Sequence, residues 1–174
     1  MKHIYEDIRT CFFDVDGTIS DGNYQISDKG EITKTFYTRD FYGIGQLLKN
    51  NINVVILTQS HDNVINKQIN RICSHSPLWN KKFLELELRI YNQRDNKKES
   101  IEYYLKEYNL KWENIAYMGD AENDIECLEL AGIAACPKDA IKEIEDVDFR
   151  SDSNGGRGAV YEFCKWLLEK KNNI

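Results

Sequence analysis

The sequence predicts an α/β fold in which a mostly parallel, Rossmann-like sheet is covered by helices on both faces. Two observations lead to this prediction. Short apolar runs end abruptly at polar or glycine-containing turns, as buried parallel strands do, and segments with helical spacing lie between them. The 174 residues are enough for one domain, residues 1–174, with a single core.

The apolar runs predict five strands along the chain. Four runs are strongly apolar, while the last one is weaker and is expected at an edge of the sheet. The clearest helices carry apolar residues at positions i, i+3 and i+4, around Leu105 and around Phe163. The predicted strands lie within residues 8–15, 52–58, 114–119, 131–136 and 146–150.

Two segments interrupt this alternation of strands and helices. Residues 21–40 alternate apolar and polar side chains around the turn sequence Asp28-Lys29-Gly30, which predicts a β-hairpin flap standing off the sheet. Residues 74–96 are longer than an ordinary connection. They fit an added strand, an interface element or a lid.

The composition excludes some classes of partner. The net charge of −6 and a pI near 5.2 oppose binding to nucleic acid or to an anionic membrane. The five cysteines are odd in number and widely spaced, as expected for reduced core residues. The first ten residues lack the apolar core of a signal peptide, and no run is long enough to span a bilayer. We therefore expect a cytoplasmic protein.

Two carboxylates follow the first predicted strand directly. Asp14 and Asp16 stand in the sequence DVDGT, at the carboxyl end of a strand, where ligands bind in open parallel sheets. Like charges so close together repel each other unless a cation such as Mg²⁺ binds between oxygen ligands. Taken alone, the same residues are also typical of an ordinary turn or helix cap.

Three further polar elements follow the other predicted strands. Thr58 ends the second strand, and its hydroxyl can donate to a phosphate oxygen. Asp120 and Asp124 form a GDxxxD sequence after the third strand, where they would also suit a helix cap. Lys97 or Lys98, at the start of a helix, can neutralise a phosphoryl group. Charge alone does not choose between these two lysines.

In this order, the four elements resemble those of the haloacid dehalogenase superfamily of phosphatases over nearly the whole chain. A narrower resemblance is to the small-capped branch that dephosphorylates 2-keto-3-deoxy sugar acid phosphates, such as KDO 8-phosphate and nonulosonate 9-phosphates. It rests on KTFYTRDFYGIGQLL in the hairpin region, on GGRGAVYEF, and on Asn96 before Lys97, which selects that lysine. The resemblance implies a homotetramer in which a neighbour's hairpin closes the site.

The resemblance also implies a chemical role for each carboxylate. Asp14 would attack phosphorus and form an aspartyl phosphate, which splits one hard displacement into two easier ones. Asp16 would act first as the acid and then as the base. Mg²⁺ would be held by the Asp14 carboxylate, the Asp16 backbone carbonyl and Asp120, with Asp124 as a more distant or water-mediated ligand.

The remaining implied contacts are to the substrate. Thr58, Lys97 and the backbone N–H groups of residues 15–18 would hold the phosphoryl oxygens. Gln59 stands where the family commonly has glycine, so the resemblance does not name the sugar. The candidate substrate-binding residues are Thr18, Arg39, Gln59, Lys67, Gly156 and Arg157.

Three other functions remain open from the sequence. The first alternative is also an enzyme, a phosphatase that acts on another small phosphorylated metabolite. A response-regulator receiver would be a signalling module, but it needs its phosphate-accepting Asp on the middle strand, where this chain has Thr58. A domain of the same fold that binds phosphate without catalysis is the third alternative.

Overall fold

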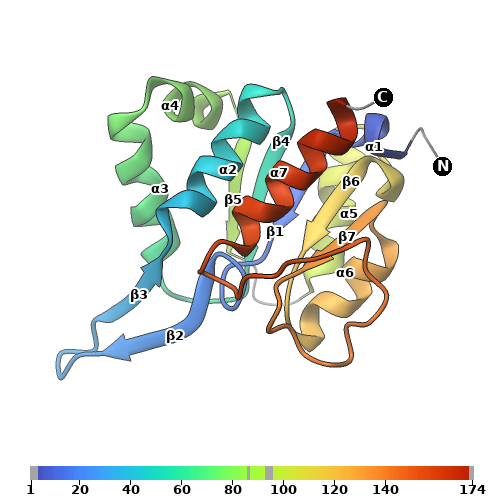
Figure 1. The fold of residues 1–174 in the computed structure, drawn as a ribbon. Helices are drawn as coiled ribbons and strands as arrows, with labels where there is room; N and C mark the ends of the chain where they lie inside the picture. Colours follow the sequence, from blue (N-terminus) through green and yellow to red (C-terminus); the bar gives the residue numbers. More distant parts are fainter. Residues whose placement is uncertain (1–3, 86, 93–95, 173–174) are drawn as a thin grey trace.

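The predicted fold class is confirmed by a computed structural model, which describes residues 4–85, 87–92 and 96–172. Within them, a six-stranded sheet has the order β5-β4-β1-β6-β7-β8, and every neighbouring pair is parallel. Helices cover both faces of this sheet (Figure 1). The strands are β1 (Thr10–Phe13), β4 (Asn53–Thr58), β5 (Leu88–Asn92), β6 (Ile115–Met118), β7 (Ile133–Cys136) and β8 (Phe149–Arg150).

Successive side chains of the central strand pack into different cores, because side chains alternate between the faces of a sheet. Phe13 packs with Ile44 of α2 and Phe163 of α7, whereas Phe12 packs with Tyr104 of α5. None of the helices formed by the described residues has the length and hydropathy of a membrane span. The helices are α1 (Ile4–Asp7), α2 (Thr38–Lys49), α3 (Val64–His75), α4 (Pro77–Leu84), α5 (Lys97–Glu107), α6 (Ile125–Leu130) and α7 (Ala159–Asn172), with 3₁₀ turns at Trp112–Asn114 and Glu122–Asp124.

All five predicted strands are present, and their order in the sheet determines where the polar residues lie. Strand β1 lies between β4 and β6, with Phe13 paired to Ile56 on one side and to Met118 on the other. The carboxyl ends of these three strands therefore meet at one edge of the sheet. Strand β8 occupies the far edge, as predicted.

The segment that the sequence left unassigned, residues 74–96, adds a strand to the sheet. After the end of α3 it forms α4 and then β5, which pairs with β4 through Val54 and Leu88. Residues 86 and 93–95 lie outside the described residues. Of the three possibilities, the structure shows the added strand, and the sheet gains an edge strand beside β4.

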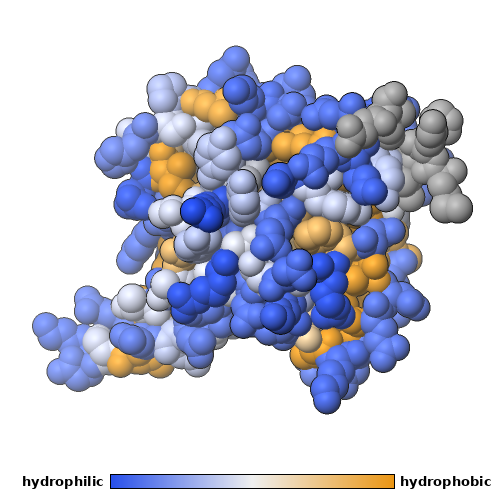
Figure 2. All heavy atoms as spheres, viewed as in Figure 1, coloured by the Kyte–Doolittle hydropathy of each residue, from blue (hydrophilic) through white to orange (hydrophobic). Residues whose placement is uncertain are grey.

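A two-stranded antiparallel hairpin, β2 (Ser20–Ile26) and β3 (Ile32–Phe36), projects from the body of the protein (Figure 1). Figure 2 shows hydrophobic atoms at its surface. Tyr24, Ile26 and Ile32 are 60%, 61% and 38% exposed. The hairpin thus has little apolar core of its own.

The predicted range of the hairpin, residues 21–40, extends too far. The chain enters helix α2 before its end, so Arg39 and Asp40 lie on that helix rather than on the descending arm. The Asp40 carboxylate is buried and accepts hydrogen bonds from the backbone N–H groups of Gly158 (3.3 Å) and Tyr161 (2.9 Å). The Asp40 carboxylate therefore satisfies N–H groups at the start of α7 that have no acceptor within that helix. This contact favours the helical position of Asp40 on α2.

Candidate active site

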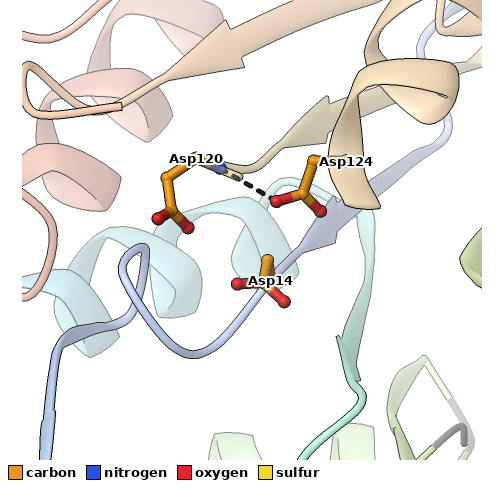
Figure 3. A group of neighbouring side chains, drawn as sticks. All are labelled: Asp14, Asp120 and Asp124. Carbon is orange, nitrogen blue, oxygen red and sulfur yellow. Dashed lines mark hydrogen bonds between the residues drawn. The ribbon is translucent and has the colours of Figure 1, made fainter. Parts of the chain in front are cut away.

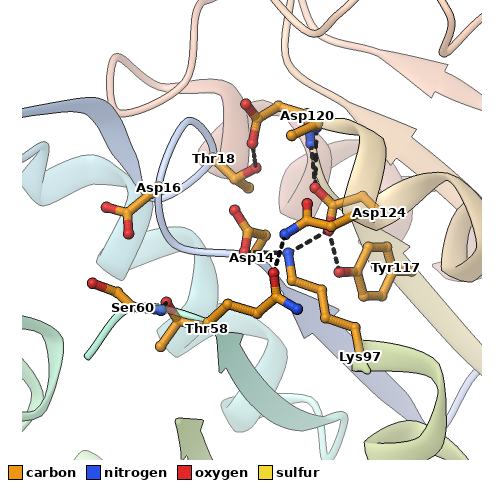
Figure 4. A network of polar contacts seen from close by, with 12 residues as sticks. Asp14, Asp16, Thr18, Thr58, Ser60, Lys97, Tyr117, Asp120 and Asp124 are labelled. Atoms are coloured by element: carbon orange, nitrogen blue, oxygen red, sulfur yellow. Dashed lines mark hydrogen bonds and ion pairs between the residues drawn. The ribbon is translucent and has the colours of Figure 1, made fainter. Parts of the chain in front are cut away.

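Four predicted residues from two strand ends and one helix start lie together at the edge of the sheet (Figure 4). Asp14 follows β1, Asp120 and Asp124 follow β6, and Lys97 is the first residue of α5. We call these four residues the strand-end cluster. Parallel pairing brings them together, because the strands that precede them end at the same level.

The three carboxylates of this cluster can share one metal ion. Each of Asp14, Asp120 and Asp124 offers an oxygen, and these oxygens lie within 4.8 Å of one another (Figure 3). Burial raises the pKa of Asp14 to about 8, against the opposing charge of Lys97. Burial also raises the pKa of Asp120 to about 6, with help from the charge of Asp124. A hard divalent cation fits this all-oxygen donor set and would favour the ionised carboxylates.

Lys97 lies between two of these carboxylates. Its Nζ donates to Asp14 Oδ1 and to Asp124 Oδ1, both at 2.6 Å, and the side chain is almost fully buried. Burial lowers the pKa of Lys97, but the two carboxylates outweigh it and raise the pKa above its ordinary value. The ammonium is therefore a fixed positive charge next to the Asp14 carboxylate. By contrast, Lys98 pairs with Glu126 at the surface.

Asp124 is the most firmly held member of the cluster. Its Oδ2 accepts from the backbone N–H groups of Asp120 (3.0 Å) and Ala121 (3.1 Å). Its Oδ1 accepts from the hydroxyl of Tyr117 (2.5 Å) as well as from Lys97. Sequence reasoning missed Tyr117, although a tyrosine inside an otherwise apolar strand signals a hydroxyl that needs a buried partner.

The glycine and threonine of DVDGT support the cluster from the first loop. Gly17 has φ +95°, and a Cβ atom there would lie 2.0 Å from Asp120 Oδ2, so only glycine fits. The Thr18 hydroxyl donates to Asp120 Oδ1 (3.1 Å), and its backbone N–H donates to Val15 O (3.3 Å). Both Thr18 donors thus bond within the protein, and its contact with a substrate stays a prediction.

Asp16 lies apart from the three clustered carboxylates, beside the hairpin (Figure 4). Its carboxylate accepts from Ser20 Oγ (3.1 Å) and pairs with Lys34 Nζ of β3, at 2.7 Å from Oδ1. Lys34 also contacts Asp62 Oδ2 (2.7 Å) and Ser60 Oγ (3.2 Å). We call Asp16, Lys34, Ser60 and Asp62 the hairpin cluster. Of its members, the sequence pointed only to Asp16.

The end of β4 supplies two more of the predicted residues. Thr58 is buried, and its Oγ1 accepts from the backbone N–H of Ser60 (3.0 Å), which leaves the hydroxyl proton for donation. The next residue, Gln59, accepts from Asn123 Nδ2 (2.6 Å). This bond joins the loop after β4 to the loop after β6 at the mouth of the site.

The other candidate substrate-binding residues lie farther out. Arg157 is exposed and pairs with Asp21 (2.9 Å), and the Gly156 N–H donates to Thr18 O (2.9 Å), so this loop packs on the first loop of its own chain. Arg39 and Lys67 are exposed. Within the described part of the chain, neither forms a hydrogen bond or ion pair with the strand-end cluster.

Comparisons with known proteins show similarities in sequence over most of the chain. The sequence signature of the haloacid dehalogenase-like hydrolases matches residues 44–163. The 3-deoxy-D-manno-octulosonate 8-phosphate phosphatase of Salmonella typhi is 32% identical over 164 residues, which cover 94% of this chain and 80% of that protein.

Two solved structures share the fold over nearly the whole chain. A hydrolase of the HAD superfamily, subfamily IIIA, from Legionella pneumophila has a TM-score of 0.85 at 26% identity and covers 99% of this chain and 88% of that one. The 3-deoxy-D-manno-octulosonate 8-phosphate phosphatase of Moraxella catarrhalis has a TM-score of 0.83 at 26% identity, covering 99% and 94%. The Moraxella protein was solved with magnesium, phosphate and KDO.

Proposed function

The chain belongs to the haloacid dehalogenase-like hydrolase family, and we propose that it is a Mg²⁺-dependent phosphomonoesterase acting on a phosphorylated 2-keto-3-deoxy sugar acid of the KDO 8-phosphate type. The carrying observation is the strand-end cluster, where Lys97 lies 2.6 Å from Asp14 beside two further carboxylates. The Salmonella relative and the ligands of the Moraxella structure support the substrate class.

The chain's own residues fit the proposed metal. Asp14 and Asp120 would hold Mg²⁺ through carboxylate oxygens, Asp16 would contribute its backbone carbonyl, and Asp124 would act more distantly or through a water molecule. When bound, Mg²⁺ supplies positive charge that neutralises the phosphoryl oxygens of the substrate. Thr58 and Lys97 add a hydroxyl donor and a second positive charge on the same side.

Covalent catalysis by Asp14 is the proposed route. The Asp14 carboxylate attacks phosphorus, the bond from phosphorus to the sugar oxygen breaks, and protonated Asp16 gives its proton to the departing oxygen. The resulting aspartyl phosphate is then attacked by water, from which Asp16 removes a proton. Inorganic phosphate leaves, and Asp14 is restored.

A cavity beside Asp16 suits the departing sugar. It has a volume of about 380 Å³ and is lined by Asp16, by the hairpin residues Tyr24, Ile32 and Lys34, and by His61. Pockets for small ligands are typically about 300–1,000 Å³. The acid of the reaction would thus face the leaving group, while the nucleophile lies deeper, at the strand ends.

Phosphate release from a panel of sugar and sugar acid phosphates, with and without Mg²⁺, tests the proposal. We expect Mg²⁺-dependent turnover of KDO 8-phosphate and a loss of at least about 10³-fold in kcat for Asp14→Asn, which removes the nucleophile but keeps its shape. Equal activity of that variant would exclude Asp14 as the nucleophile. One stable phosphorylation per chain without turnover would favour the receiver alternative.

The homotetramer and the cytoplasmic location remain predictions from the sequence. The exposed apolar side chains of the hairpin would suit contacts between copies of the chain. Light scattering coupled to size-exclusion chromatography measures the number of copies directly.

A further inference from the structure

One lysine joins the projecting hairpin to the proposed active site. Lys34 lies on β3, and its Nζ is 2.7 Å from Asp16 Oδ1, 2.8 Å from Asp16 Oδ2 and 2.7 Å from Asp62 Oδ2. It also donates to Ser60 Oγ (3.2 Å), and that hydroxyl in turn donates to Asp62. Three segments far apart in the sequence thus meet at a single ammonium group.

Lys34 differs from the other residues around it on the hairpin. Its side chain is only 4% exposed, whereas its neighbours Thr33 and Thr35 are exposed. Lysine is seldom buried without partners, since removing the ammonium from water must be offset by paired charges. Burial of Lys34 therefore depends on the two carboxylates that it contacts, and one of them is the proposed acid and base.

We propose that Lys34 is a positioning residue, which attaches the hairpin to the active site of its own chain and holds the Asp16 carboxylate toward the leaving-group cavity. This inference rests on the proposed function. The inference goes beyond the proposed function by assigning the hairpin a role within its own subunit.

The charges of the hairpin cluster explain how Lys34 would act. Asp16 and Asp62 both contact one ammonium, so without it two negative groups would face each other and repel. The Asp16 carboxylate is 36% exposed and would then be held by the Ser20 hydroxyl alone. It would turn toward solvent, and proton transfer to the departing oxygen would lose its geometry.

The test compares two leaving groups. Lys34→Met keeps the length of the side chain but removes the charge. We expect it to lower kcat/KM about 10- to 100-fold for KDO 8-phosphate, or the best alkyl ester of the panel, but less than about threefold for 4-nitrophenyl phosphate, whose leaving group departs without a proton. Lys34→Arg should restore part of the loss, and Lys29→Met, at the exposed turn of the hairpin, should change neither value. Equal losses on both esters would overturn the positioning role.

A double-mutant cycle measures the coupling to Asp16. In an Asp16→Asn background there is no carboxylate left to position, so Lys34→Met should cause little further loss on the alkyl ester. Full additivity of the two losses would overturn the proposal.

Mixed oligomers of Asp14→Asn and Lys34→Met subunits test whether Lys34 acts within its own chain. They should regain no activity, since each active site would lack one of the two residues. Recovery of activity would show that Lys34 acts on a neighbouring subunit instead.

Amide hydrogen exchange tests the attachment without any activity. Lys34→Met should speed exchange in residues 24–34 relative to the wild type and to Lys29→Met, because a free two-stranded hairpin is marginally stable. Unchanged exchange would overturn the attachment. If the wild type hydrolyses no phosphate ester, the proposed function fails, and exchange still decides whether Lys34 holds the hairpin.

Discussion

The strand-end cluster and the hairpin cluster both place one lysine between carboxylates, but they are held in different ways. Lys97 begins helix α5, its partners Asp14 and Asp124 follow the core strands β1 and β6, and the Asp14 side chain is 8% exposed. Lys34 comes from an antiparallel hairpin outside the main sheet, and its partner Asp16 is far more exposed. The first cluster is held by the core, and the second by the contacts of one hairpin lysine.

This difference suits the two tasks of the proposed reaction. The groups that bind metal and attack phosphorus need fixed positions, because transfer depends on alignment and preorganised charge. The group that exchanges protons with the departing sugar, and later with water, must face a space through which both can pass. The cavity of about 380 Å³ beside Asp16 provides such a space.

The largest expected effect is in the strand-end cluster. Lys97→Met leaves Asp14 and Asp124 buried without their cation, so the free energy of unfolding without Mg²⁺ should fall by about 3–5 kcal/mol. Activity should be lost as well. Mg²⁺ should restore part of the stability, because it compensates the same carboxylates and binds only the folded chain. Urea unfolding with and without Mg²⁺ measures both effects.

The neighbouring lysine provides a matched control for this prediction. Lys98 pairs with Glu126 at 2.6 Å, the same distance that separates Lys97 from Asp14, but the pair is exposed to solvent. Lys98→Met should therefore change stability and activity little. A similar loss in both variants would show that burial does not distinguish the two ion pairs.

Most of the fold could be predicted, because it depends on local patterns. The apolar runs gave all five predicted strands their approximate positions, and β8 lies at an edge. The added strand β5 was not predicted because it follows helix α4 within one long connection. The end of the hairpin was misplaced because residues 38–40 join α2, where Asp40 bonds to the start of α7, a contact over more than a hundred residues.

The two clusters differ in how much the sequence could predict. The carboxylates of the strand-end cluster come directly after apolar runs, and the resemblance selected Lys97 over Lys98. Lys34, Ser60 and Asp62 carry no such signal, since a lysine in an alternating hairpin is typical of a solvated face. Only the folded structure shows that these three meet at Asp16.

Two glycines test whether the first loop, beside the strand-end cluster, tolerates a side chain less well than the turn of the hairpin does. Gly17 and Gly30 both have positive φ, +95° and +78°, but a Cβ atom would meet Asp120 Oδ2 at 2.0 Å in the first and nothing within 4 Å in the second. Gly17→Ala should displace Asp120 and weaken Mg²⁺ binding by at least about tenfold. Gly30→Ala should cost only about 1–2 kcal/mol of backbone strain, with Mg²⁺ affinity unchanged. Isothermal titration calorimetry measures the Mg²⁺ affinity of both variants. Equal affinities in Gly17→Ala and Gly30→Ala would contradict the role given to Gly17.

Asp40, just after the hairpin, provides a further test, since it is a buried carboxylate held by backbone N–H groups. Burial raises its pKa from 3.8 to about 6. The folded chain therefore binds this proton more tightly than the unfolded chain, so the Asp40 contribution to stability falls as pH rises from about 4 to about 6 and is constant above. The loss should reach about 2–3 kcal/mol. Asp40→Asn cannot ionise, so urea unfolding at pH 4, 5, 6 and 7 should show the variant gaining stability relative to the wild type across that range. If the stabilities of the two proteins instead changed in parallel with pH, the N–H groups at the start of α7 would offset the burial of Asp40. A carboxylate in this fold could then stay ionised while buried without a lysine partner.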